Sequence, residues 1–568
     1  MRHSLDLAAA NAGAIGLVAM LAVASVGCRS KDPPAPAASV TLAEAPAPAT
    51  LLAEFSLGNP KETWRRLRLL GGDAAQALPS SLPVLLATSL SFPPAAAGSL
   101  DESLPMVGVV LSREAASEPD LVLGMHVTSG AELVASLTLG DGAKFRRVEL
   151  APRLVRLVAA PGAQEFNGAL GVSGNYLLLA TRVEAMKEAG RFAAETVSKR
   201  AASEPGLSLR TNERVLKGSL SRVLREGWQA RRAVLVAGAA QQQQAKGRAA
   251  DFADPAVILG GVDNTVEAFL GVVESSTQLD VSLVPEADRL RAELSLVPGP
   301  EGAASLLASE IVTGPIAPLL QLPKGTSAAL LLRGDEQPKA GAAGLAESIT
   351  RLFGERLSAE QAAKLSRAFE ALAQSHRGAT VVGLLGGPAP ALLITCEVTD
   401  PIAFSNAVAG VLRLIELGPV NSWLAGTTGK PSLELAKSKL PNMGQAQLRF
   451  KRRRDSVVLP LPASLTVTWE AKDGIGYVVV TPGGSASSAP FSEPVRLSAS
   501  DWLQKTQPQL AAQSALGLYL DARLLAPGGP DDAPILLALG KRDGRIVLGV
   551  DLAPAALRAV SRIFALDR

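Results

Sequence analysis

Aromatic residues and histidines are scarce in this 568-residue chain. Phe, Trp and Tyr together make up 4% of it, and there are 3 histidines, of which His3 lies near the N-terminus. The other two, His126 and His376, give no zinc-ligand spacing, no His-Glu-x-x-His motif and no Ser-His-Asp set. Neither a Gly-Lys-Ser/Thr phosphate loop nor Gly-x-Gly-x-x-Gly occurs. We therefore expect no enzyme, no bound metal and no cofactor, while the many carboxylates leave a paired-carboxylate hydrolase open as an alternative.

Cysteine is limited to Cys28 and Cys396. Cys28 ends an apolar N-terminal stretch, so it is not expected to pair with Cys396, and no internal disulfide is predicted. Cys396 falls on the apolar face of a predicted strand. We expect a buried thiol that fills the core rather than a nucleophile.

Charge and hydropathy exclude two further classes of protein. The net charge is +3 and is spread along the chain, which argues against a dedicated nucleic-acid binder. Beyond the N-terminal stretch, no run of 18 or more apolar residues lacks charges or helix breakers, so no further membrane span is predicted.

The N-terminus has the features of a secretory signal. A basic start, Met1-Arg-His3, is followed by an apolar run from Leu7 to Gly27 and then by Cys28. The ending Val-Gly-Cys resembles the lipobox of bacterial lipoproteins, and this resemblance implies that Cys28 becomes the first residue and carries the lipid. An uncleaved membrane anchor and a soluble secreted protein remain as alternatives. Arg29 follows the cysteine where enterobacterial sorting would place Asp for inner-membrane retention, so the resemblance favours the outer membrane.

A Pro- and Ala-rich segment, residues 29–50, follows the cysteine. Its five prolines predict an extended tether that holds the body at a distance from a membrane.

The body contains a strand, a helix cap and a helix that recur. Residues 396–408 match residues 125–137 at an offset of 271 residues (396 − 125), with Asp400 and Ser129 both at the expected N-cap. Strands and helices of the same type precede and follow both copies, and the run 144–147 was matched to 449–452 with an insertion. The pattern predicts an α+β fold of two tandem, internally duplicated units, each a mainly antiparallel sheet covered by helices.

The expected organisation follows from this repeat. It comprises residues 1–28 as a lipoprotein signal peptide, 29–50 as the tether, 51–314 as repeat unit 1, 315–326 as a linker rich in Pro and Gly, and 327–568 as repeat unit 2.

Two basic stretches are candidates for contact with anionic partners. Residues 214–232 predict a helix with an apolar stripe, including Val223 and Trp228, and a basic face, which we expect to pack on its own domain rather than on a membrane. The densest basic run could dock an anionic envelope partner or form a solvated turn. It contains Arg449, Lys451, Arg452, Arg453 and Arg454.

The function is predicted mainly from the cellular location that the N-terminal signal indicates. The body resembles uncharacterised large envelope lipoproteins in general style. We expect a non-catalytic, lipid-anchored cell-envelope protein, facing the periplasm or the surface, that binds or assembles envelope proteins and no nucleic acid. Its alternatives are a carrier of an apolar ligand or lipid and a hydrolase of envelope polymers.

Overall fold

A computed structural model has an α+β fold, as the sequence predicts. It describes residues 45–71, 79–89, 92, 96, 98–113, 119–139, 143–161, 168–245, 255–334, 357–386, 390–427, 429–436, 438, 440–451, 462–483, 496–504, 513–522 and 533–558. The chain divides into two compact units, each assembled from separate parts of the sequence. Unit 1 comprises Met1–Ser219, Ser276–Val297 and Val547–Arg568, and unit 2 comprises Leu220–Ser275 and Pro298–Ile546.

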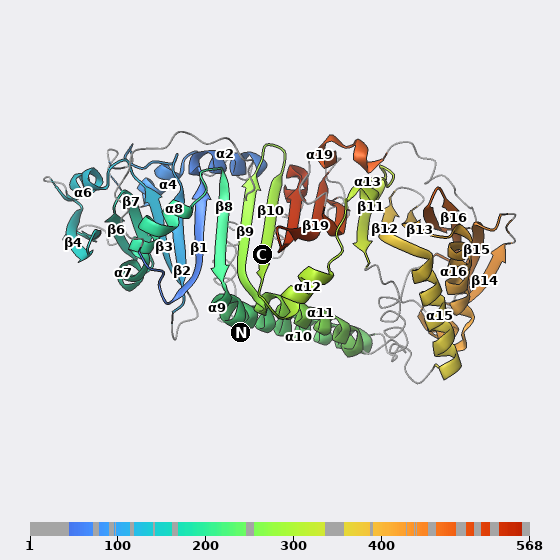
Figure 1. Ribbon diagram of the computed structural model, residues 1–568. Helices are drawn as coiled ribbons and strands as arrows, with labels where there is room; N and C mark the ends of the chain where they lie inside the picture. The colour runs from blue at the N-terminus through green and yellow to red at the C-terminus, as the bar shows by residue number, and fades with distance from the viewer. Residues whose placement is uncertain are drawn as a thin grey trace. The chain divides into compact units, whose positions relative to one another are not determined.

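Unit 1 is built on one sheet (Figure 1). Its strands are β1 (Leu51–Gly58), β2 (Met106–Leu111), β3 (Asp120–His126), β4 (Phe145–Ala151), β5 (Leu154–Ala159), β6 (Ala169–Ser173), β7 (Tyr176–Ala180), β8 (Gly206–Asn212), β9 (Ser276–Pro285), β10 (Leu290–Pro298) and, from Val547 onward, β20 (Arg545–Leu552). The order across the sheet is β4-β5-β6-β7-β3-β2-β1-β8-β9-β10-β20. Every pairing from β4 to β9 is antiparallel.

Helices cover both faces of the unit 1 sheet. They are α2 (Pro60–Gly71), α4 (Leu82–Ser89), α6 (Gly130–Thr138), α7 (Val183–Phe192), η1 (Ala193–Val197), α8 (Ser198–Arg200) and α9 (Glu213–Val215). Successive strand residues point to opposite faces. Val122 of β3 therefore packs in one core with Met186 of α7, while Met125 packs in another with Leu133 of α6.

The strands of unit 2 are also paired in antiparallel fashion. They are β11 (Thr326–Arg333), β12 (His376–Leu385), β13 (Ala391–Val398), β14 (Lys430–Ala436), β15 (Met443–Lys451), β16 (Ser464–Lys472), β17 (Ile475–Pro482), β18 (Ser514–Asp521) and β19 (Pro534–Arg542). The order is β14-β15-β16-β17-β13-β12-β11-β18-β19. The turn between β16 and β17 has Asp473 and Gly474 at φ of 53° and 77°, values typical of a two-residue hairpin turn.

One face of this sheet is covered by two packed helices. The helices of unit 2 include α12 (Ala303–Glu310), α13 (Ala317–Leu320), α15 (Ala359–Ser375), α16 (Pro401–Arg413), η4 (Leu414–Glu416), α17 (Gly418–Thr427), η5 (Leu497–Ala499) and α19 (Asp501–Gln504). Phe404 of α16 packs with Trp469 of β16, whose indole donates a 2.9 Å hydrogen bond to Ser405. The ring of Trp469 lies over Gly444, where an added Cβ would be only 2.2 Å from the ring. A glycine is therefore required opposite this tryptophan.

The long basic helix lies against a second helix. It is α10 (Ser221–Ala245), and it contacts α11 (Pro255–Glu274). Arg225 is 3.1 Å from Glu274, and Arg232 is 2.9 Å from Asp263. The expectation of a buried stripe with solvated charges is only partly right. Val223 is 54% exposed, because α10 contacts α11 partly through charged residues.

The repeated strand, cap and helix are confirmed at the local level. Ser129 Oγ accepts from the backbone N–H of Glu132 at 3.3 Å, and Asp400 Oδ1 accepts from Ile402 and Ala403 at 2.8 and 3.1 Å. Both caps satisfy N–H groups that the first helical turn leaves without partners. Each therefore ends a strand and starts a helix.

Residues 315–326, expected as a linker, are packed. They include α13, and the side chains of Ile316, Leu319 and Leu322 are buried.

Among the described helices, none is by itself long and apolar enough to cross a bilayer, although Pro401–Glu416 and Gly418–Ala425, bent by 69°, meet that test as a pair.

Candidate functional site

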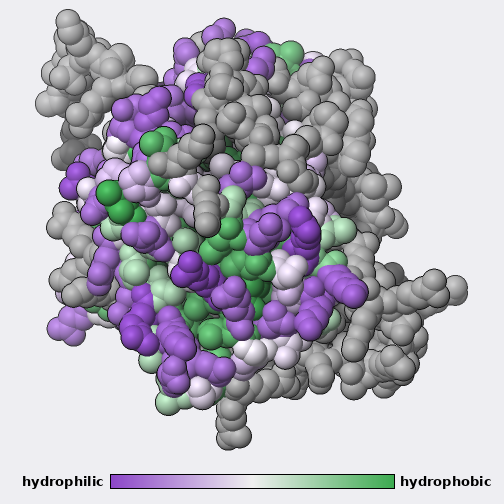
Figure 2. Space-filling view, turned by 90° about the vertical axis from the view of Figure 1, so that its right-hand side faces the viewer, coloured by the Kyte–Doolittle hydropathy of each residue, from purple (hydrophilic) through white to green (hydrophobic). Residues whose placement is uncertain are grey.

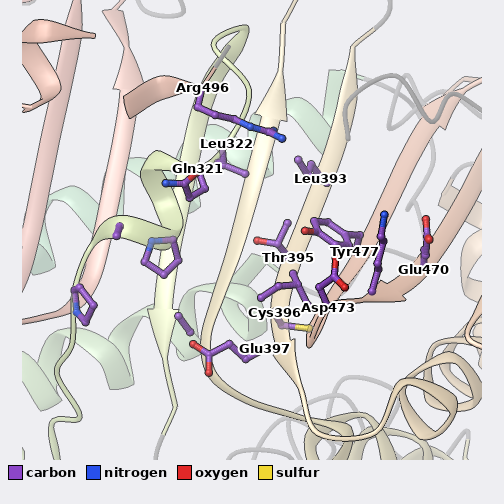
Figure 3. A pocket seen from close by; sticks show the side chains of 16 residues that line it. Gln321, Leu322, Leu393, Thr395, Cys396, Glu397, Glu470, Asp473, Tyr477 and Arg496 are labelled. Carbon is purple, nitrogen blue, oxygen red and sulfur yellow. The ribbon is translucent and has the colours of Figure 1, made fainter. Parts of the chain in front are cut away.

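A cavity lies on the sheet of unit 2, on the face opposite α16 (Figure 3). Its volume is about 660 Å³. It is bounded on one side by α13 and its flanking residues and on the other by the turn between β16 and β17. The lining residues are Pro315, Ala317, Pro318, Gln321, Leu322, Ala379, Leu393, Thr395, Cys396, Glu397, Glu470, Lys472, Asp473, Ile475, Tyr477 and Arg496.

The floor of this pocket is a row of polar side chains across three strands. Thr395 of β13 pairs with Tyr477 of β17, which in turn pairs with Glu470 of β16. Directly paired residues point to the same face of a sheet. The three side chains therefore line the pocket together, with the apolar side chain of Leu393 beside them.

The helical side of the pocket is set by a close approach to the sheet. A Cβ added at Gly383 would lie 2.9 Å from Leu322 Cδ1. The glycine thus lets Leu322, which is 2% exposed, press onto β12 and places Gln321 at the pocket wall.

Charges of opposite sign lie at different ends of the pocket. Figure 3 shows Arg496 and Gln321 at one end and Glu397 at the other, with Asp473 and Tyr477 between them. Burial raises the pKa of Tyr477, the nearby Arg496 lowers it, and Asp473 and Glu470 raise it. A ligand here would meet an apolar wall together with hydrogen-bonding groups of both charges.

Cys396 is buried, as the sequence predicts. Its side chain belongs to the core cluster that contains Phe404 and Val408. Burial, with a smaller contribution from Glu397, raises the pKa of the thiol to about 12. A thiol that stays protonated at neutral pH is a poor nucleophile.

A second hollow, of about 610 Å³, lies between α6 and the strands β4 to β6 of unit 1. We call it the arginine groove. Arg146, Arg147 and Arg153 line it, and all three are exposed. Its remaining lining residues are apolar or small, apart from Thr138.

The basic run chosen from the sequence is only partly described. Arg449 and Lys451 are exposed on β15, whereas Arg452, Arg453 and Arg454 lie outside the described residues. Arg449 is engaged locally, because its guanidinium lies 3.5 Å from Glu434 and donates to Gln447. Figure 2, which faces this part of unit 2, shows hydrophilic side chains around an apolar area.

Neither described histidine stands in a metal site. His126 Nδ1 lies 3.1 Å from Asp101, its ring packs edge-on against Tyr176, and the side chain is partly buried. His376 Nδ1 lies 2.6 Å from the carbonyl of Leu372. In the described part of the chain, no group of three or more His, Cys, Asp or Glu side chains has metal-binding geometry. Cys28, the predicted lipidation site, lies outside the described residues.

No family model, curated protein or solved structure matches this chain. The arguments about function therefore depend on the site itself.

The sequence did not single out either site. The pocket is lined by residues from five separate segments of the chain. The sequence predicts the run Lys144-Phe-Arg-Arg147 only as the counterpart of 449–452. The strand order places it on β4, the fourth strand of unit 1, whereas Arg449 and Lys451 are on β15, the fifth strand of unit 2.

Proposed function

We propose that this protein is a non-catalytic, lipid-anchored cell-envelope protein that binds a small amphipathic ligand in the pocket of unit 2. The observation that carries the proposal is the polar row Thr395, Tyr477 and Glu470 beside the apolar wall at Leu322 and Leu393. Binding sites commonly combine an apolar lining with a few convergent polar groups that fix orientation.

We further propose that the two halves arose by duplication. The strand orders support this, since β4-β5-β6-β7-β3-β2-β1-β8-β9 and β14-β15-β16-β17-β13-β12-β11-β18-β19 differ only by ten in every label. The capped helices α6 and α16 also follow equivalent strands, β3 and β13. The sequence offset of 271 residues, which sets Cys396 on Met125, agrees with the same order.

A comparison of the two halves supports a specialised role for unit 2. Setting Cys396 on Met125 sets Thr395 on Gly124. The strand register then sets Tyr477 on Leu178 and Glu470 on Gly171. One half therefore has a polar row where the other has two glycines and a leucine.

In unit 1 a helix occupies the space over these positions. A Cβ on Gly171 would lie 2.6 Å from Met186 Sδ of α7, and one on Gly190 would lie 3.0 Å from Leu178 Cδ1. At Gly171 a larger side chain would therefore require movement of Met186 or of the backbone at Val155. In unit 2 the corresponding positions carry Thr395, Tyr477 and Glu470 and line a cavity, which is the arrangement expected if unit 2 binds a ligand and unit 1 serves as a packed scaffold.

The location in the cell envelope is proposed from the N-terminal signal sequence. The lipobox-like ending at Cys28 and the Pro-rich tether support anchoring in the envelope, with the outer membrane favoured. Metabolic labelling with palmitate tests this part alone. Label is expected on the wild type and not on Cys28→Ala, and an unlabelled wild type that still begins at Met1 would contradict it.

The ligand is tested by native mass spectrometry of the full chain purified from envelope membranes. We expect an additional non-covalent mass on the wild type that is lost in Thr395→Phe, because the ring would fill the pocket. Ser432→Phe, at an exposed position on β14, is the matched control and should keep the mass. Equal occupancy in all three proteins, or none in any, would reject the ligand site.

A hydrolase of envelope polymers is the second candidate. It is favoured by three carboxylates in the pocket, Glu397, Glu470 and Asp473. Release of soluble fragments from isolated envelope polymer by the wild type, and its loss in Glu470→Gln, would support this candidate over a binding protein.

A further inference from the structure

The residues that line the arginine groove of unit 1 carry positive charge only. Arg146, Arg147 and Arg153 all line it, and no acidic side chain does. None of the three has an ion-pair partner in the described part of the chain. The nearest acidic residues in sequence are Glu149, which pairs with the lining residue Val155, and Asp141, which lies outside the described residues. Alternation along β4 puts Arg147 on the face of the sheet that Phe145 shares with α6, and Arg153 lies at the turn that follows β4. Arginines at a hollow favour a ligand with phosphate or carboxylate oxygens.

Apolar side chains accompany these arginines. Val134 and Val155 line the groove, and Leu139 at its edge is 72% exposed. Exposed aliphatic residues beside arginines suit a membrane interface, where the side chains enter the headgroup layer and the charges meet lipid phosphates.

Unit 1 is also the part of the protein to which the tether is joined. Ala45 is buried in the core of unit 1, and its carbonyl accepts a 2.9 Å hydrogen bond from Thr196. Cys28 lies 17 residues before it (45 − 28), so even a fully extended tether places the start of unit 1 within about 60 Å of an anchored lipid. A surface of unit 1 can therefore return to the membrane that holds the anchor.

We propose that the arginine groove binds the phosphate of an anionic lipid headgroup in the membrane that carries the anchor. The groove grips one headgroup, while Leu139 enters the interface beside it. The inference rests on the proposed lipid anchor. The groove adds a second, charge-dependent contact that orients unit 1 on the membrane. Two weak membrane signals together give stable attachment where one alone is reversible.

The test uses the full chain with Cys28→Ala, so that no acyl chain contributes. Its co-sedimentation is measured with vesicles of phosphatidylcholine alone and of phosphatidylcholine with phosphatidylglycerol. We expect binding only to the anionic vesicles. Replacing Arg146, Arg147 and Arg153 with Gln should lower the partition coefficient on the order of 100-fold, at roughly a factor of five for each arginine.

The matched control removes three exposed cations of unit 2, with Arg377→Gln, Arg413→Gln and Lys430→Gln together. It changes the net charge equally and should bind nearly as the parent does. Circular dichroism and thermal unfolding check that both triple variants are folded.

Equal losses in the two triple variants would show a general charge effect and overturn the groove. Equal binding to neutral and anionic vesicles, or no binding to either, would also overturn the proposed headgroup site. An acidic protein would then be the occupant to test. Palmitate labelling at Cys28 is measured separately, so failure of the anchor is distinguished from failure of the groove.

Discussion

Thr395 and Tyr477 lie directly opposite each other on β13 and β17, and both line the pocket of unit 2. The corresponding pair in unit 1, Gly124 and Leu178, is also directly paired. The same sheet position thus carries two hydrogen-bonding side chains in one half and none in the other. The ligand site we propose depends on this difference.

Tyr477 should titrate above its ordinary value of 10, because burial and the neighbouring acidic groups disfavour the phenolate. Phenolate absorbance of the wild type minus that of Tyr477→Phe isolates this group. In Asp473→Asn the midpoint should fall, and in Arg496→Gln it should rise. The unfolded chain ionises first as the pH passes 10, so this group should reduce stability above that pH. A midpoint at or below 10 would contradict the buried environment.

Cys396 should resist thiol reagents in the folded protein, because burial raises its pKa to about 12. Labelling of the Cys28→Ala chain with a thiol-reactive dye should be slow in buffer and fast in denaturant. The raised pKa means that burial stabilises the neutral thiol relative to the thiolate. The reactivity of Cys396 should therefore stay low until strongly alkaline pH. Rapid stoichiometric labelling of native protein at neutral pH would disprove the burial.

An ion pair holds the start of β3 to the start of α7. Arg182 Nε donates to Asp120 Oδ1 at 2.8 Å, and Asp120 is 5% exposed. Hydrogen bonding by Arg182 and Thr181 holds the pKa of Asp120 below its ordinary 3.8, against the opposing effect of burial.

Asp120→Asn should therefore destabilise unit 1 by about 1–3 kcal/mol, a value discounted because Arg182 is partly exposed. The stabilisation is present above the unfolded pKa near 3.8 and is lost as the pH falls through the lower folded pKa. Denaturant unfolding at neutral and acidic pH measures both effects. A variant as stable as the wild type at neutral pH would contradict the role of this pair.

The two helix caps should contribute similarly. Ser129→Ala and Asp400→Ala should each cost about 1 kcal/mol, because each leaves first-turn N–H groups without a partner. Ser136→Ala, whose hydroxyl bonds a carbonyl within the same helix, is a control that should cost less. Chemical denaturation compares the three, and equal small effects for all would show that the caps are dispensable.

Local sequence patterns predicted the local structure well. The helix caps at Ser129 and Asp400 and the strands that precede them each depend on a few neighbouring residues, and all are present. The α+β class followed from their repetition. The packing of Leu319 within the expected linker was not predicted, because Pro and Gly indicate breaks in regular structure but not burial.

The sites could not be found in the same way. Thr395, Tyr477 and Glu470 come together only through the register of β13, β17 and β16, and pairing across β3, β7 and β6 brings glycines to the corresponding place. The arginine groove likewise joins Arg146 and Arg153 across a hairpin turn and against α6. Charge density along the sequence favoured Arg449 instead, but this arginine lies beside Glu434, which a linear count does not reveal.

A crystal structure of the full-length protein extracted from its own membranes tests the central claim most directly. We predict electron density for a small amphipathic molecule in the unit 2 pocket, with polar atoms within hydrogen-bond distance of Tyr477 and of Arg496 or Glu397, and with apolar atoms against Leu322. A pocket filled by side chains of the chain itself, or holding only solvent in protein that was never exposed to competing detergent, would contradict the account.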